Sequence, residues 1–288
     1  MTTKTKHIFI GGSGRSGTTL LGNLFRAHPD VIYFGEPGFL IEEHGANDYI
    51  NGSTTRDEFK HAAVTRVHDR LQKKLSAYGY QNASLAYSAQ RISDVVENHL
   101  LGQGSSLDEM SYLIEDLLGI GRLAEGKRHW VEKTPRSIIM ADTLFAMFPD
   151  MRYFHMIREP KSVCASFLQQ TWGVDSVEDS VANYCEMMQR GFQSQARVSC
   201  DQYFVISLET LARQVDAILP PIFESCGIRF DSDIIQGCAS LVSRDRVNTL
   251  RWPDIIDSRD AKLIDKRCGP IYRKWLTLER KTLGRLHV

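Results

Sequence analysis

The glycine-rich stretch at residues 8–21, IFIGGSGRSGTTLL, constrains the fold of this chain more than any other segment. Its apolar start predicts a buried strand, its glycines a tight turn, and the residues from Thr18 onward a helix. Such a turn presents the free N–H groups and the positive dipole end of the helix to an anion. Residues 12–19 match the spacing of a nucleotide-triphosphate loop, but Thr18 stands where the lysine belongs and the cation is Arg15. This departure favours a phosphate-bearing donor other than the nucleotides of an ATPase or kinase.

The alternation of strands and helices predicts an α/β fold with a central parallel sheet flanked by helices, and ligands at the carboxyl ends of the strands. The expected strands are residues 7–11, 31–34, 128–132, 151–157 and 203–207. The expected helices around them are residues 18–27, 136–148, 160–171 and 177–197.

Region 55–122 interrupts this alternation, because it is polar and strand-poor. Helices are expected there near residues 56–78, 88–101 and 107–119. We expect the region to be a helical insertion or lid within a single domain of residues 1–288.

Composition limits the kinds of partner. Lys+Arg and Asp+Glu both number 35, so no net charge attracts nucleic acid or an anionic membrane, and any anion site must be local. No apolar run approaches the roughly 18–20 residues that span a bilayer, and residues 1–10 lack the pattern of a secretory signal, so none is expected. The six cysteines form no C-x-x-C pair, which indicates reduced, structural or incidental thiols. A cytoplasmic protein without a membrane span or metal site is expected.

A second candidate anion site lies at residues 151–168, MRYFHMIREPKSVCASFL. Arg158 ends the predicted strand, Pro160 starts a helix, and Ser166 lies about two turns into that helix, so the two polar side chains can face one groove. A guanidinium and a hydroxyl suit a phosphate monoester. Alone, this segment is also explained by a salt bridge that caps a helix.

Together the two motifs suit a nucleotide with phosphates on both ends of its ribose, and here the chain resembles the PAPS-dependent sulfotransferases. Their donor is 3′-phosphoadenosine 5′-phosphosulfate (PAPS), and the resemblance covers residues 7–40 and 128–211. It implies that Arg158 and Ser166 hold the 3′-phosphate. It also implies that the 5′-phosphosulfate is held by Gly14, Arg15, Ser16, Gly17, Thr18 and Thr19.

The resemblance also suggests the catalytic groups. The family's cytosolic branch follows the equivalent of Lys133 and Thr134 with a histidine base, but this chain has Pro135 there. The layout is more similar to the tyrosylprotein sulfotransferases, which implies that Glu36 is the general base, assisted by Arg15 and Lys133. A solvated loop carboxylate is the alternative reading of Glu36.

Some features of the chain leave alternatives open. Ser243 resembles a catalytic serine of the tyrosylprotein branch, but a serine that caps a helix or turn is an equal alternative. Leu208 stands where the family often has a tyrosine near the nucleotide, and the R-K-G loop of the cytosolic branch is absent. Trp172 and Trp252 suit either an acceptor cleft or simple packing. His129 and His155 are expected to be core or rim residues.

Three functions are compatible with a phosphate-binding turn. The leading one is transfer of a sulfuryl group from PAPS to a hydroxyl acceptor, which the sequence does not identify as a small molecule, glycan, lipid or peptide. The second is a catalytically silent protein that binds PAPS or its product PAP. The third is a P-loop kinase, which would need a lysine at position 18 and a magnesium-binding aspartate on a strand that ends instead in Arg158.

Overall fold

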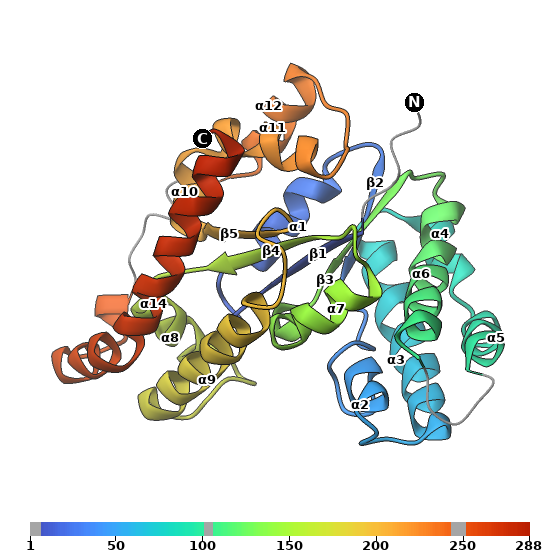
Figure 1. Cartoon of the computed structure of the whole chain (residues 1–288), viewed down its shortest axis with the longest axis horizontal. Coiled ribbons are helices and arrows are strands. Elements are labelled where there is room, and N and C mark those ends of the chain that lie inside the picture. Colours follow the sequence, from blue (N-terminus) through green and yellow to red (C-terminus); the bar gives the residue numbers. More distant parts are fainter. Residues whose placement is uncertain (1–6, 101–105, 243–251) are drawn as a thin grey trace.

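A computed structural model describes residues 7–100, 106–242 and 252–288 of the chain. At its centre is a sheet of five parallel strands in the order β2-β3-β1-β4-β5, which confirms the predicted fold class (Figure 1). The strands are β1 (Ile8–Gly12), β2 (Val31–Gly35), β3 (His129–Lys133), β4 (Arg152–Ile157) and β5 (Tyr203–Ser207). Because Glu132 pairs with both Phe9 and Phe34, the carboxyl ends of β1, β2 and β3 lie at the same level, and the loops that follow these strands start close together.

Alternate side chains of the strands bury themselves in two separate cores, one on each face of the sheet. Phe9 and Phe34 belong to the first core, which includes residues of α3 (Arg56–Ala77), α6 (Leu107–Ala124) and α9 (Val177–Gln195). Ile10 and Tyr33 belong to the second core, together with residues of α1 (Thr18–Arg26) and α11 (Val215–Ser225). Helices therefore cover both faces, as a parallel sheet requires.

Of the helices between β2 and β3 in the chain, α3 to α6 gather at the β2 edge of the sheet (Figure 1). Capping boxes start two of them, Thr55 with Glu58 at α3 and Ser106 with Glu109 at α6. Their role as a lid remains a prediction. The other helical elements are α2 (Ala46–Ile50), α4 (Gln81–Ala86), α5 (Ala89–His99), η1 (Pro135–Met140), α7 (Ala141–Met147), α8 (Pro160–Leu168), α10 (Leu208–Arg213), α12 (Ser232–Ser240), η2 (Trp252–Asp254) and α14 (Ser258–Leu286). Across the described ranges, no helix is both long and apolar enough to cross a bilayer.

The long helix α14 covers the β5 edge of the sheet. Thr282 Oγ1 accepts a hydrogen bond from the backbone N–H of Val205 at 3.1 Å, and Glu279 Oε1 accepts one from that of Ser207 at 2.6 Å. These side chains satisfy N–H groups that an edge strand otherwise leaves open. Pro270 lies inside α14, which changes direction in its first half (Figure 1).

Some predicted boundaries were wrong. The expected helix at residues 136–148 is instead a 3₁₀ helix, η1, followed by α7. Tertiary packing explains the difference, because Ile138 of η1 packs closely against Gly191 of α9. The helix expected to reach residue 171 ends at Leu168. The short helices α2 and α4 were not predicted.

Candidate active site

The turn between β1 and α1 forms the first anion-binding element. Gly17 precedes α1 with a φ of 90°, a backbone conformation that favours glycine, and a Cβ there would lie 2.7 Å from Cδ1 of Leu208, which would have to shift. In the described chain, no side chain caps the N–H groups of α1, and its first turn holds no acidic residue. These N–H groups are therefore available, and the dipole favours an anion. Leu208, the departure from the family tyrosine, packs against this turn.

The second motif contacts the first directly. Arg15 Nε donates a hydrogen bond to Ser166 Oγ at 2.9 Å, and Arg158 Nη1 donates one to the carbonyl of Arg15 at 3.1 Å. Arg15 has a φ of 68°, which is unusual outside glycine, and its carbonyl faces Arg158. The sequence alone left the distance between the two anion sites open. In the folded chain they adjoin at the carboxyl ends of the neighbouring strands β1 and β4.

Behind Arg158 lies Glu209, which sequence reasoning missed. Burial lowers the pKa of Arg158, although Glu209 partly offsets that effect. Burial also raises the pKa of Glu209, while the backbone N–H of Glu159 donates to its Oε1 at 3.2 Å. Glu209 is thus a nearby acidic group that favours the charge of the partly buried guanidinium.

Glu36 and Lys133 form an ion pair at the ends of the adjacent strands β2 and β3. The backbone N–H of Glu36 donates to the carbonyl of Lys133 at 2.7 Å, and Lys133 Nζ donates to Glu36 Oε1. The Lys133 side chain is 5% exposed and that of Glu36 is 41% exposed. Burial alone would raise the pKa of Glu36, but Lys133, Lys74 and Arg70 together hold it below its usual value. Glu36 is therefore a paired, half-exposed carboxylate at neutral pH.

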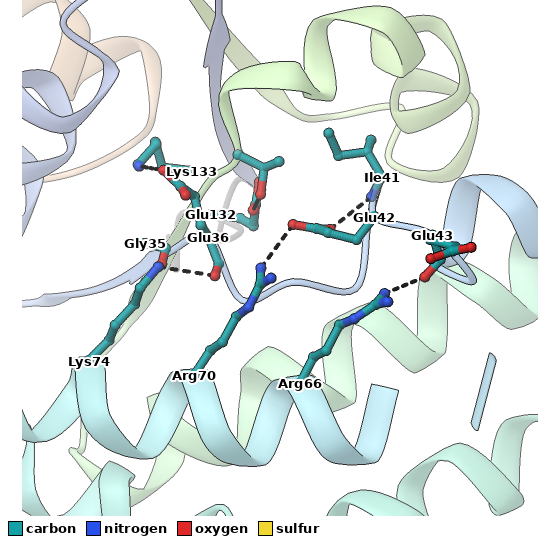
Figure 2. A network of polar contacts seen from close by, with 11 residues as sticks. Gly35, Glu36, Ile41, Glu42, Glu43, Arg66, Arg70, Lys74, Glu132 and Lys133 are labelled. Carbon is teal, nitrogen blue, oxygen red and sulfur yellow. Dashed lines mark hydrogen bonds and ion pairs between the residues drawn. The ribbon is translucent and has the colours of Figure 1, made fainter. Parts of the chain in front are cut away.

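Three cations at intervals of four residues on α3 hold the loop that carries Glu36. Figure 2 shows Arg66, Arg70 and Lys74 extending from the helix toward this loop. Lys74 Nζ donates to the carbonyls of Gly35 and Glu36, the latter at 3.2 Å. The other two bind the loop farther on, Arg70 through the Glu42 carboxylate at 3.2 Å and Arg66 through the carbonyl of Glu43. The four-residue spacing of these cations is visible in the sequence, but the loop that they bind is not.

Glu132 is a second acidic residue beside the site that the sequence reasoning missed. It precedes Lys133 on β3, it is completely buried, and its Oε1 accepts a hydrogen bond from the hydroxyl of Thr134. Burial raises the pKa of Glu132 to about 8, which Glu42 reinforces and Thr134 partly offsets. Glu132 is consequently neutral at pH 7, so that Lys133 faces one ionised carboxylate, Glu36.

A cavity of about 450 Å³ opens beside these groups. It is bounded by the anion-binding turn, by Glu36 and Glu42, by the start of η1 and by residues of α8 and α9. Trp172 lines it and is 66% exposed. Trp252 is not among the lining residues and instead lies under Lys161 Nζ, 4.8 Å from the ring centroid. The lining residues that come from beyond the turn are Glu36, Ile41, Glu42, Thr134, Pro135, Arg136, Phe167, Trp172, Asn183, Tyr184, Glu186 and Met187.

The remaining predicted residues are Ser243, His155 and His129. Ser243 lies outside the described residues. His155 is buried in the core, where burial lowers its pKa to about 3 and Tyr203 is its hydrogen-bond partner at 2.7 Å. His129 is also buried, at the start of β3 and so at the opposite end of the strand from Lys133. Within the described ranges no three His, Cys, Asp or Glu side chains are grouped as metal ligands.

Comparison with known proteins identifies the class. The profile of the sulfotransferase family matches residues 7–232, and the chain therefore belongs to the sulfotransferase family. The nodulation protein NoeE of Sinorhizobium fredii is 27% identical over 173 residues. That match covers 59% of this chain but 33% of NoeE.

Two solved structures share the fold. The sulfotransferase domain from the curacin biosynthetic pathway superposes with a TM-score of 0.58 at 17% identity, covering 93% of this chain and 99% of that domain. The sulfotransferase domain of the Synechococcus PCC 7002 olefin synthase gives a TM-score of 0.55 at 19% identity, covering 98% and 96%. The sheet and its flanking helices are therefore those of a sulfotransferase.

Proposed function

We propose that this protein transfers a sulfuryl group from PAPS to a hydroxyl-bearing acceptor. The observation that carries the proposal is the direct contact between the two anion-binding motifs, Arg15 with Ser166 and Arg158 with the carbonyl of Arg15. A donor with phosphate groups at both ends of one ribose needs two such elements side by side. Membership of the sulfotransferase family supports the same donor.

The residues present fit this donor. The uncapped N–H groups of α1 and the turn residues 14–19 would hold the 5′-phosphosulfate. Arg158 and Ser166 would hold the 3′-phosphate, because a guanidinium and a hydroxyl supply the donors that a phosphate monoester accepts. Leu208 offers an apolar side chain beside Gly17 in place of the tyrosine of other family members.

In this proposal Glu36 removes the proton from the acceptor hydroxyl as its oxygen forms a bond to sulfur and the bond from sulfur to the phosphate oxygen breaks. The depressed pKa keeps Glu36 ionised, so its carboxylate has a free lone pair for that proton, while the same cations that lower the pKa also lower its basicity. Arg15 and Lys133 stabilise the charge that builds on the transferring group and the leaving phosphate. Of these three residues, Glu36 is the one that accepts a proton in the proposed reaction.

The cavity of about 450 Å³ is the proposed acceptor site, because Glu36 and Arg15 both line it. Its walls combine the aromatic rings of Phe167, Trp172 and Tyr184 with charges at Arg136 and Glu186. A panel of hydroxyl compounds, incubated with purified protein and radiolabelled PAPS, would identify the acceptor. PAP binding without transfer to any compound of the panel would support the catalytically silent alternative.

Binding of PAP and of adenosine 5′-phosphate by the Arg158→Met variant tests the donor site without knowledge of the acceptor. Calorimetry in magnesium-free buffer should show PAP affinity reduced by about 10- to 100-fold, the effect of losing about 1.5–3 kcal/mol of charge-assisted bonding. Adenosine 5′-phosphate lacks the 3′-phosphate, so its affinity should not change.

Arg128→Met is the matched control, because Arg128 is a half-exposed arginine that precedes β3, at the end of the sheet opposite the site. It should bind both nucleotides as the wild type does. Equal losses for both nucleotides in Arg158→Met, or no PAP binding by the wild type, would refute the proposed donor site.

A further inference from the structure

Three of the six cysteines, which are scattered in the sequence, meet at one point of the fold. Cys164 lies on α8, Cys185 on α9 and Cys268 on α14. The Sγ atoms of Cys185 and Cys268 are 3.6 Å apart, and the Cys268 thiol is also hydrogen-bonded to the thiol of Cys164. The sequence predicted structural or incidental thiols, and their convergence was not visible in their spacing.

Cys185 differs from its two neighbours in access to solvent. Cys164 and Cys268 are completely buried, whereas Cys185 is only partly buried. It opens into a second cavity, of about 340 Å³, whose walls include the cations Arg267 and Lys274. A small neutral oxidant can therefore reach Cys185, and nearby positive charge favours its thiolate.

We propose that Cys185 is a peroxide-reactive thiol and that Cys268 resolves it by forming an intramolecular disulfide. In the first step the Cys185 thiolate attacks a hydroperoxide, takes one oxygen as sulfenic acid, and releases the alcohol or water. In the second step the sulfur of Cys268 attacks that of Cys185, and the hydroxyl leaves with the Cys268 proton as water. The two thiols give up two electrons, which the peroxide accepts.

The chemistry and the geometry agree with this assignment. The hydrogen bond with Cys268 and the charge of Arg267 together lower the pKa of Cys185 to about 7, and burial only partly opposes them. An S–S bond of about 2.05 Å requires the two sulfurs to approach by about 1.6 Å from their separation of 3.6 Å. Since α9 and α14 pack directly against each other, side-chain rotation and a small helix shift can supply that approach.

The disulfide would join α14 to a helix that forms part of the proposed acceptor site. Tyr184 and Glu186 flank Cys185 and line the larger cavity. Cys164, the third thiol, precedes Ser166 by two residues on α8. The thiol site itself is separate from the proposed donor-binding residues, and its chemistry does not depend on the proposed function.

The test is oxidation of the full chain with one equivalent of hydrogen peroxide at pH 7, followed by N-ethylmaleimide and peptide mass mapping. We expect a Cys185–Cys268 linked peptide, with Cys185 consumed about tenfold faster than the exposed, isolated Cys200. In Cys268→Ser, dimedone should trap a sulfenic acid at Cys185. In Cys185→Ser, no linkage to Cys268 should form.

Thermal unfolding with and without PAP checks that both variants remain folded. This control needs no reactive cysteine. Oxidation of Cys200 before Cys185, or a Cys164–Cys268 linkage in the wild type, would overturn the proposal. Persistence of all free thiols at ten equivalents of peroxide would overturn it as well.

Discussion

Glu36 has a φ of 54°, and its carboxylate contacts a nearly buried lysine while remaining 41% exposed. A non-glycine residue in this backbone region costs free energy, and such residues concentrate where function requires a defined side-chain position. We predict that Glu36→Gln keeps PAP affinity unchanged but lowers kcat by about 100-fold or more, the usual effect of losing a general base. The measurement is transfer from radiolabelled PAPS to the identified acceptor.

Glu43→Gln is the matched control, because Glu43 lies on the same loop with a side chain that is 81% exposed. Its kcat should stay within about twofold of the wild type, as for most exposed positions. A Glu36→Gln enzyme with normal turnover would exclude Glu36 as the base.

Glu132 predicts a specific pH dependence of stability. Its pKa is about 8 in the folded protein, against an ordinary value of 4.5. As the pH rises from 4.5 to about 8, the unfolded chain releases this proton while the folded chain retains it, so the stability contributed by the protonated group is progressively lost. Glu132→Gln removes this loss, and its free energy of unfolding relative to the wild type should increase by about 1.4 kcal/mol per pH unit within that range.

Urea unfolding at pH 5, 6.5 and 8 measures the effect of Glu132→Gln. The same series on Glu43→Gln should give a difference from the wild type that hardly varies with pH. If the Glu132→Gln difference is also constant, Glu132 is ionised in the folded protein at neutral pH.

At the scale of elements, helix α3 holds the loop that carries Glu36, the proposed general base. Lys74 donates to the carbonyls on both sides of the bond between Gly35 and Glu36, and so holds the backbone that positions the carboxylate. We predict that Lys74→Met lowers kcat by about 10- to 100-fold, since small displacements of a catalytic group have effects of this size. PAP affinity should remain unchanged, because the hydrogen bonds of Lys74 go to the carbonyls of Gly35 and Glu36 and not to the anion-binding turn.

Lys73→Met controls for the lost charge, because Lys73 is the preceding residue of the same helix and is exposed. It should retain wild-type kcat and KM. Similar losses in both variants would indicate that the charge of α3, rather than its bond to the loop, matters.

At the scale of the whole molecule, the proposed donor would join two loops that are far apart in sequence. Hydrogen exchange should therefore slow on PAP binding at residues 12–20 and 158–167 together, since a ligand that binds the folded state suppresses local opening. Adenosine, which lacks both phosphates, is the control and should protect neither segment. Protection of one segment alone would contradict a donor that bridges Arg15 and Arg158.

The sequence could predict much of the fold, because local patterns encode strand alternation, helix starts and phosphate-binding turns. It predicted the parallel sheet and the turn around Arg15, and it placed Glu36, Lys133 and Arg158 at strand ends. It could not predict the break at Met140, which depends on how Ile138 packs against α9.

Contacts between distant segments were decided only by the tertiary structure. The bond from Lys74 to the loop of Glu36, the burial of Glu132, and the meeting of Cys185 with Cys268 all join elements that no local pattern relates. The sequence by itself determined which chemical groups are available and at which strand ends they stand. Only the packed structure determined their distances, burial and charge states, because these depend on which helices cover each edge of the sheet.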